Sequence, residues 1–180
     1  MQKLDLLKLL IYARGSTMRD NENIPSKTHL QKEMFLLLKE TVFQKVEGYK
    51  FIPHYYGPFS RDLDSDLNEL VTSGLVNDSA GFVLTPDGFK DANALWNSLD
   101  QPHRTALSRI KERYNKLTSE KLLDYVYEEY NKYTVKSAMI LDNLYSYFDS
   151  FALENDLTND DLDIASNRIR HPINEKCNRF

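Results

Sequence analysis

The stretch from Leu70 to Gly88 constrains the fold more than any other part of the chain. A helical repeat of apolar residues ends at Leu70 and Val71, and Gly74 follows where the end of a helix favours glycine. Two short β-rich pieces within residues 75–84 flank a turn-forming segment, a pattern typical of a hairpin. Thr85-Pro86-Asp87-Gly88 then combines an N-cap residue with proline at the first helical position. The stretch predicts a helix, a small hairpin and another helix in close succession.

Apolar residues at helical spacing predict further helices on both sides of this stretch. Before it, helices are predicted near residues 4–15, 28–42 and 60–73, and Tyr49–Tyr56 has the composition of a short strand. After it, helices are predicted near residues 107–114, 119–130, 138–151 and 158–169. The order helix, helix, strand, helix, hairpin, helix is typical of a winged helix-turn-helix. We therefore expect a mainly α protein with a small β-hairpin.

Two parts of the chain differ in predicted organisation. Residues 1–99 are expected to form the winged helix-turn-helix-like domain. Residues 100–180 are expected to form a helical extension, which either packs on the first domain or provides a dimer seam. A homodimer is accordingly one expected assembly.

The composition indicates the cellular compartment that we expect for such a protein. Cys177 is the single cysteine, so no disulfide can form within the chain, as is usual in a reducing compartment. No run approaches 18 apolar residues, and the charged N-terminus differs from a signal peptide. We expect a cytoplasmic protein with no membrane partner.

No pattern of reactive residues indicates catalysis. The four histidines, His29, His54, His103 and His171, have no zinc-like spacing to one another or to cysteine. Glycine-rich phosphate loops and nucleophile elbows are absent from the sequence. We expect a protein that is no enzyme and has no cofactor and no metal. A competing enzyme hypothesis would require a deep pocket holding several of His54, Tyr55, Arg61 and Asp62.

The helix expected to enter the DNA major groove is acidic. The net charge of −4 is uneven, and residues 54–100 carry two basic and eight acidic side chains. Within residues 59–73, Arg61 is the only cation beside Asp62, Asp64, Asp66 and Glu69. Such a face repels phosphate and disfavours nucleic acid. If nucleic acid is bound, the expected contacts are Lys27, Lys32, Arg61, Arg109 and Arg113.

Two segments resemble a known family. Thr28-His29-Leu30-Gln31-Lys32-Glu33-Met34-Phe35-Leu36-Leu37 is similar to its L-Q-K-x-x-F/Y-L helix. Phe51-Ile52-Pro53-His54-Tyr55-Tyr56-Gly57-Pro58-Phe59-Ser60-Arg61-Asp62-Leu63 is similar to its Y-x-G-P-[FY]-S-x-x-L segment. Over roughly residues 4–96 the chain resembles the YwgA-like proteins of bacteria and archaea, and more loosely the Panacea (SocA-like) antitoxin domain. The resemblance implies binding of a partner protein and no catalytic residue.

The role of the Tyr56-Gly57-Pro58-Phe59 motif has two interpretations. It either builds the structure, with Ser60 capping a helix, or it presents an exposed patch to a partner. The expected partner-binding residues are Tyr56, Phe59, Arg61, Asp62, Asp66 and Glu69. The expected function is a non-catalytic regulatory or interaction protein, antitoxin-like or defence-associated, that binds another protein. The alternative is a dimeric winged-helix DNA-binding transcriptional regulator.

Overall fold

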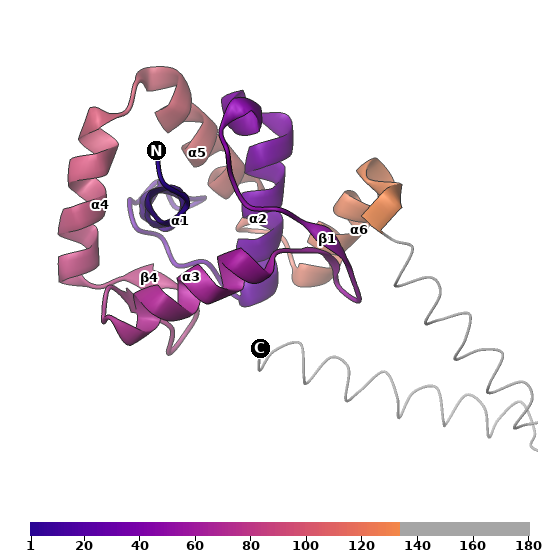
Figure 1. Ribbon diagram of the computed structural model, residues 1–180, viewed down its shortest axis with the longest axis horizontal. Coiled ribbons are helices and arrows are strands. Elements are labelled where there is room, and N and C mark those ends of the chain that lie inside the picture. The colour runs from indigo at the N-terminus through magenta and orange to yellow at the C-terminus, as the bar shows by residue number, and fades with distance from the viewer. Residues whose placement is uncertain (134–180) are drawn as a thin grey trace, which may run out of the picture.

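The computed structural model describes residues 1–133, and its centre is the first helix, α1 (Lys3–Tyr12). α1 has apolar residues around most of its circumference. The buried ones are Leu6, Leu7, Leu9, Leu10, Ile11 and Tyr12. A helix that is apolar on every side needs neighbours on every side. Figure 1 shows α1 end-on, within a ring formed by α2 (Lys27–Glu40), α3 (Arg61–Thr72), α4 (Pro86–Ser98) and α5 (Gln101–Tyr114).

Most of the described helices begin at a side-chain N-cap, whereas α1 has none. Ser26, Ser60 and Thr85 each accept a hydrogen bond from the backbone N–H three residues later, as N-cap residues do. Asp100 caps α5 in the same way, and Thr118 caps α6 (Ser119–Glu129). These caps fix where the helices start, and with them the loops that form the surface.

The predicted hairpin is present, and a third segment of the chain pairs beside it. β3 (Val76–Asn77) pairs antiparallel with β4 (Val83–Leu84), with Val76 opposite Leu84. Ile24, from the loop between α1 and α2, exchanges two backbone hydrogen bonds with Phe82, of 3.0 and 2.8 Å. The chain before α2 is thereby held against the strand that leads into α4.

A second hairpin replaces the single strand predicted at Tyr49–Tyr56. β1 (Ile52–His54) pairs antiparallel with β2 (Gly57–Phe59), so the chain turns back directly after the end of the predicted strand. Gly57 adopts a φ of 76°, a left-handed conformation that glycine tolerates best. Pro53 lies opposite Pro58, and a two-stranded hairpin with open edges accommodates both residues without a backbone N–H.

The last described elements pack on the earlier ones. α5 contacts α1 and α2, and α6 contacts α2, while a short 3₁₀ helix (Val42–Lys45) follows α2. Another 3₁₀ helix, Asn131–Tyr133, lies against β1. The ring of Phe35 has the rings of Phe51, Tyr130 and Tyr133 at centroid distances of 5.3, 4.9 and 4.9 Å. Aromatic packing thus joins α2 to the segments after α6.

The coarse fold prediction is confirmed: the described part is mainly helical, with two small antiparallel strand pairs. The helices predicted at residues 138–151 and 158–169 and the single cysteine lie outside the described residues. The division at residue 99 stays a prediction. Within residues 1–133, no helix has the length and apolar character needed to cross a membrane.

Candidate interaction surfaces

The two segments that carry the family resemblance contact each other directly. The Gln31 side chain on α2 donates from Nε2 to the Ser60 carbonyl at 3.0 Å, and its Oε1 accepts from the Ser60 N–H at 2.9 Å. The next residue, Lys32, donates from Nζ to the Pro58 carbonyl at 3.0 Å. All three contacts are buried, so they satisfy backbone groups that water cannot reach. The L-Q-K helix therefore holds the G-P-F-S segment in place.

Gly57 fits closely into this arrangement. A Cβ at this position would lie 3.3 Å from Lys32 Cε, 3.4 Å from Leu123 Cδ2 and 3.4 Å from Tyr127 Cε1. The Tyr127 hydroxyl donates to the Tyr55 carbonyl at 3.3 Å, which ties α6 to the turn of this hairpin. The motif is thus built into the contact between α2, α6 and the hairpin.

The prediction that Lys32 contacts nucleic acid does not fit the structure. Lys32 is only 2% exposed, and its ammonium is already bonded to the Pro58 carbonyl. Burial lowers the pKa of Lys32 to about 7, because a charged ammonium is poorly solvated there. Lysine is mostly a surface residue, which is why the sequence alone suggested a solvent-facing cation.

The aromatic residues of the predicted partner patch are only half exposed. The Phe59 ring lies against the His54 ring, with centroids 5.0 Å apart, and Tyr56 is half-buried. The more exposed side chains of this hairpin are Tyr55 at 55% and Ile52 at 46%. The backbone of the motif is therefore anchored inside, and neighbouring side chains reach solvent, while a role in partner binding stays a prediction.

Three of the four carboxylates on α3 have partners within the protein. Asp62 forms an ion pair with Lys3 at 2.8 Å, and Asp64 forms one with Lys27 at 2.9 Å. Asp66 accepts a hydrogen bond of 2.8 Å from the Tyr49 hydroxyl. The hydrogen bond and charge of Lys3 lower the pKa of the Asp62 carboxyl. Much of the acidic charge of α3 is therefore used in holding α1, α2 and the segment before β1.

Glu69 is the remaining carboxylate of α3. It is exposed and forms no ion pair with any residue in 1–133. Arg61 and Asp62 are exposed on the first turn of the same helix, and Asp78 is exposed in the turn between β3 and β4. Four of the six predicted partner-binding residues, Arg61, Asp62, Asp66 and Glu69, thus share α3, and Tyr56 and Phe59 lie on the hairpin before it.

The predicted nucleic-acid contacts do not form one surface. Lys27 is paired with Asp64 at the start of α2, whereas Arg109 and Arg113 lie one turn apart on α5. Both arginines are exposed, and neither forms an ion pair within the described part of the chain. The Arg113 guanidinium lies over the Tyr114 and Tyr125 rings, at 5.0 and 5.1 Å from their centroids. Arg61 is on α3, with the acidic residues.

A buried pair of ionisable residues was missed by the sequence analysis. Glu33 on α2 and Lys111 on α5 are both fully buried, and Lys111 donates to the Ile11 carbonyl. Burial raises the pKa of Glu33 to about 8, and the attraction of Lys111 only partly opposes this shift. Neither carboxylate oxygen of Glu33 has a hydrogen-bond partner among residues 1–133. Spacing along the sequence gives no signal for such a pair, because packing of α2 on α5 creates it.

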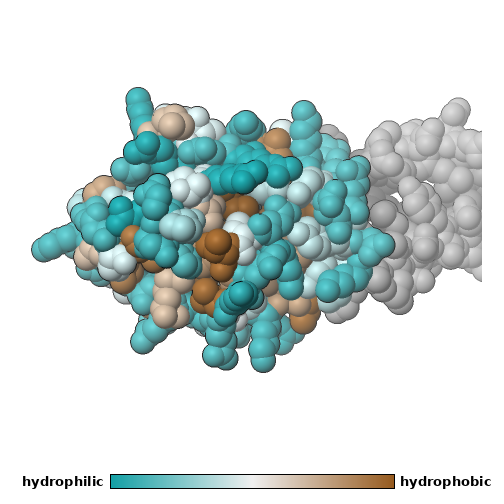
Figure 2. Space-filling model, turned by 90° about the horizontal axis from the view of Figure 1, so that it is seen from above, coloured by the Kyte–Doolittle hydropathy of each residue, from teal (hydrophilic) through white to brown (hydrophobic). Residues whose placement is uncertain are grey.

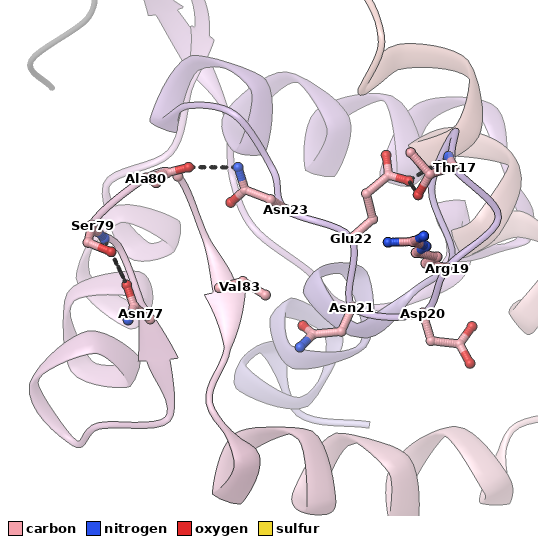
Figure 3. Close-up of a pocket in the computed structure, with 11 residues that line it drawn as sticks. Thr17, Arg19, Asp20, Asn21, Glu22, Asn23, Asn77, Ser79, Ala80 and Val83 are labelled. Atoms are coloured by element: carbon pink, nitrogen blue, oxygen red, sulfur yellow. Dashed lines mark hydrogen bonds between the residues drawn. The ribbon is translucent and has the colours of Figure 1, made fainter.

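The loop after α1 is organised around Glu22. Its carboxylate accepts hydrogen bonds from the Ser16 and Thr17 N–H groups, at 3.0 and 2.6 Å, and from Asn115 Nδ2 at 2.8 Å. Burial alone would raise the pKa of Glu22, but these hydrogen bonds outweigh it and lower the pKa to about 2. The loop and the β3–β4 hairpin border an open hollow of about 500 Å³ (Figure 3). Asn23 closes one end by donating to the Ala80 carbonyl at 2.7 Å.

Glu40, at the end of α2, forms hydrogen bonds with three tyrosines. Its carboxylate accepts hydrogen bonds from the hydroxyls of Tyr114, Tyr125 and Tyr130, at 3.1, 3.0 and 3.2 Å. These tyrosines come from α5, from α6 and from its C-terminal end. The network fixes α5 and α6 relative to α2.

The enzyme hypothesis requires a pocket lined by particular residues, and three surface hollows can be compared with it. Two further hollows, of about 360 and 530 Å³, lie along α5. The residues that this hypothesis requires, His54, Tyr55, Arg61 and Asp62, line none of these three hollows. Within residues 1–133, no three histidine or carboxylate side chains are grouped closely enough to hold a metal ion.

The chain matches no protein-family model, no curated protein and no solved structure. The resemblance to the YwgA-like and SocA-like proteins therefore rests on the two quoted segments and stays a prediction.

Proposed function

We propose that the protein is a non-catalytic interaction module with a winged-helix arrangement, and that α3 receives a basic partner protein. Two observations support the winged-helix arrangement. The elements follow the expected order from α1 to α4, and Ile24 pairs beside β4 as a third short strand would. In such an arrangement α3 takes the place of the recognition helix, and the β3–β4 turn takes the place of the wing.

The charge of exposed α3 carries the proposal. Glu69 is exposed with no ion pair among residues 1–133, Asp62 is exposed in its pair with Lys3, and Arg61 is the only cation on the helix. Binding to DNA draws its affinity from lysine and arginine beside phosphates, and this face offers a single arginine among carboxylates. Complementary charge steers protein partners together instead, so a partner with exposed lysine or arginine fits this face. A toxin that itself binds nucleic acid would have such a surface, which gives the antitoxin-like role its chemical basis.

The face of the molecule that Figure 2 shows offers no stronger candidate surface for a partner protein. Figure 2, seen from above relative to Figure 1, shows a mainly hydrophilic surface with hydrophobic residues confined to small areas. Broad exposed apolar patches mark many protein interfaces, and this face has none. A charge-guided contact through α3 is therefore favoured over an apolar contact on the face shown.

Site-specific crosslinking in the source organism tests the proposal. A photoreactive amino acid at position 69 should crosslink to one basic protein, and the same amino acid at position 128 should not. Glu128 is the matched control because it is also an exposed glutamate, on α6. Adducts identical from both positions, or no adduct from position 69, would contradict a partner on α3.

A second candidate function is the dimeric DNA-binding regulator, and the exposed pair Arg109 and Arg113 favours it. These side chains lie on α5, so duplex DNA would contact that helix rather than α3. A mobility-shift titration with duplex DNA at low salt tests this candidate, since phosphate contacts are strongest there. Binding that is lost in the double variant R109Q/R113Q would favour it, and no shift at low salt would exclude it.

A further inference from the structure

A surface hollow of about 530 Å³ lies where the end of α1 meets α4 and α5. Its size falls within the roughly 300–1,000 Å³ of small-molecule sites. One face of α5 forms most of it, through residues spaced three or four apart. The lining residues on α5 are Gln101, Arg104, Thr105, Ser108, Arg109 and Glu112. Hydroxyl, amide and guanidinium groups thus face one hollow.

Three arginines border this hollow, and they differ in how far they are engaged. The Arg14 Nε lies 3.3 Å from the Asp20 carboxylate. Arg104 donates from Nη2 to the Asn97 carbonyl at 2.9 Å, while its Nε is buried with no hydrogen-bond partner in the described part of the chain. Arg109 is exposed and has no ion pair with any residue in 1–133. Asp20 and Glu112 supply two negative charges, so the lining is basic by one charge.

Trp96 provides an aromatic wall next to these arginines. It lies on α4, is half-buried, and packs its ring 5.4 Å from the ring of Tyr12. Packing on Tyr12 fixes the indole, whose remaining surface borders the hollow. Fixed aromatic rings stack with nucleobases, and arginine forks bind phosphate oxygens. The hollow therefore combines the two groups that recognise a nucleotide.

We propose that this hollow binds a nucleotide, with its phosphate at Arg104 and Arg109 and its base against Trp96. Thr105 and Ser108 supply hydroxyls for the sugar or for phosphate oxygens. A free nucleotide and an unpaired nucleotide within a single strand offer the same chemistry. A base stacked inside a duplex does not, because Trp96 cannot reach it. The site is on α4 and α5, so it stands independently of the partner surface on α3.

The protein carries its own reporter for this site, because Trp96 is its only tryptophan. Titration of the full chain with adenosine monophosphate should change the intrinsic fluorescence in a saturable way. Inorganic phosphate should compete with the nucleotide, and adenosine without phosphate should bind at least about tenfold more weakly, the loss expected for one charged contact. Calorimetry on the same samples measures the affinity independently of fluorescence.

Two arginine variants on the same helix separate a site from general charge. Arg109→Gln should weaken binding at least about tenfold. Arg113→Gln removes the same charge one turn further along α5, outside this hollow, and should leave binding unchanged. Both side chains are exposed, so the variants are expected to fold, and their melting temperatures verify this.

A comparison of ligands identifies the source of the nucleotide. Tighter binding of the mononucleotide indicates a free ligand, and tighter binding of a short single-stranded oligonucleotide indicates an unpaired strand. Either result supports the site. Three results would overturn it: no saturable binding of both ligands, equal affinity in Arg109→Gln, or duplex DNA binding as tightly as the single strand.

Discussion

Gln31 and Ser60 exchange two hydrogen bonds in which one side chain satisfies both backbone groups of the other residue. The Nε2–O distance is 3.0 Å and the N–Oε1 distance is 2.9 Å, and Ser60 is only 1% exposed. Ser60 is also the N-cap of α3. One glutamine on α2 thereby positions the start of the helix on which the proposed partner surface lies.

Replacement of this glutamine should destabilise the fold without touching the surface. Gln31→Ala leaves the N–H of Ser60 buried and unsatisfied, at about 1–3 kcal/mol, whereas the Ser60 carbonyl keeps its hydrogen bond of 3.2 Å from the Asp64 N–H. Chemical denaturation should therefore give a loss of about 1–3 kcal/mol in the free energy of unfolding. Gln2→Ala is the matched control, because Gln2 is exposed and makes no side-chain cap bond. Equal stability of the two variants would mean that the Gln31 contacts are not needed.

A comparison of two glycines with nearly the same φ distinguishes the cost of backbone strain from the cost of crowding around a new Cβ. Gly57 has a φ of 76° and Gly74 a φ of 73°, but only Gly57 has side chains closely around it. Gly74→Ala should cost about 1–2 kcal/mol for the left-handed conformation alone. Gly57→Ala should cost more, since its Cβ would also lie 3.3 Å from Lys32 Cε, which must shift slightly inside a buried contact. Thermal melts of both variants measure the difference, and a smaller loss for Gly57→Ala would argue against the tight fit.

Glu22 should make the fold sensitive to acid. Its folded pKa of about 2 lies below its ordinary value of 4.5, so the folded state binds fewer protons between these values. The stability from this carboxylate is present above pH 4.5 and is lost as the pH falls toward 2. Glu22→Gln should be less stable than the wild type at neutral pH, and the gap should close over that window. Glu128→Gln on the exposed face of α6 should show no such gap.

Glu33 should change the stability with pH in the direction opposite to that of Glu22. Its folded pKa of about 8 lies above 4.5, so the folded state keeps a proton that the unfolded chain releases. Stability contributed by this carboxyl is complete below pH 4.5 and declines as the pH rises toward 8. Glu33→Gln should match the wild type near pH 4.5 and become relatively more stable up to pH 8. Urea unfolding across that range checks it, and a constant difference between the two proteins would contradict a buried neutral carboxyl.

The sequence predicted the elements that depend on local patterns. Apolar spacing and capping residues identify α1 to α4, and turn residues identify the β3–β4 hairpin. The β1–β2 hairpin was predicted as one strand, because Gly57-Pro58 is locally typical of the end of a strand rather than of a turn inside a hairpin. What local patterns cannot supply is the partner of a side chain across the fold.

Lys32 and Asp66 illustrate that limit at the candidate surfaces. Both were predicted to face a binding partner, but Lys32 bonds to Pro58 and Asp66 to Tyr49. The hollow beside Trp96 was also missed, since its residues come from three separate segments. Charge counting along the chain found the acidic character of α3, and only the packed structure distinguishes Glu69 from its paired neighbours.

The most direct test of the proposed partner surface is charge reversal at Glu69. Tagged wild-type protein, Glu69→Lys and Glu128→Lys are purified from the source organism, and the retained partner is quantified by mass spectrometry. The proposal predicts that Glu69→Lys loses the partner at least about tenfold while Glu128→Lys retains it, because only the first places like charges together. Equal retention by Glu69→Lys and the wild type would contradict a basic partner on α3.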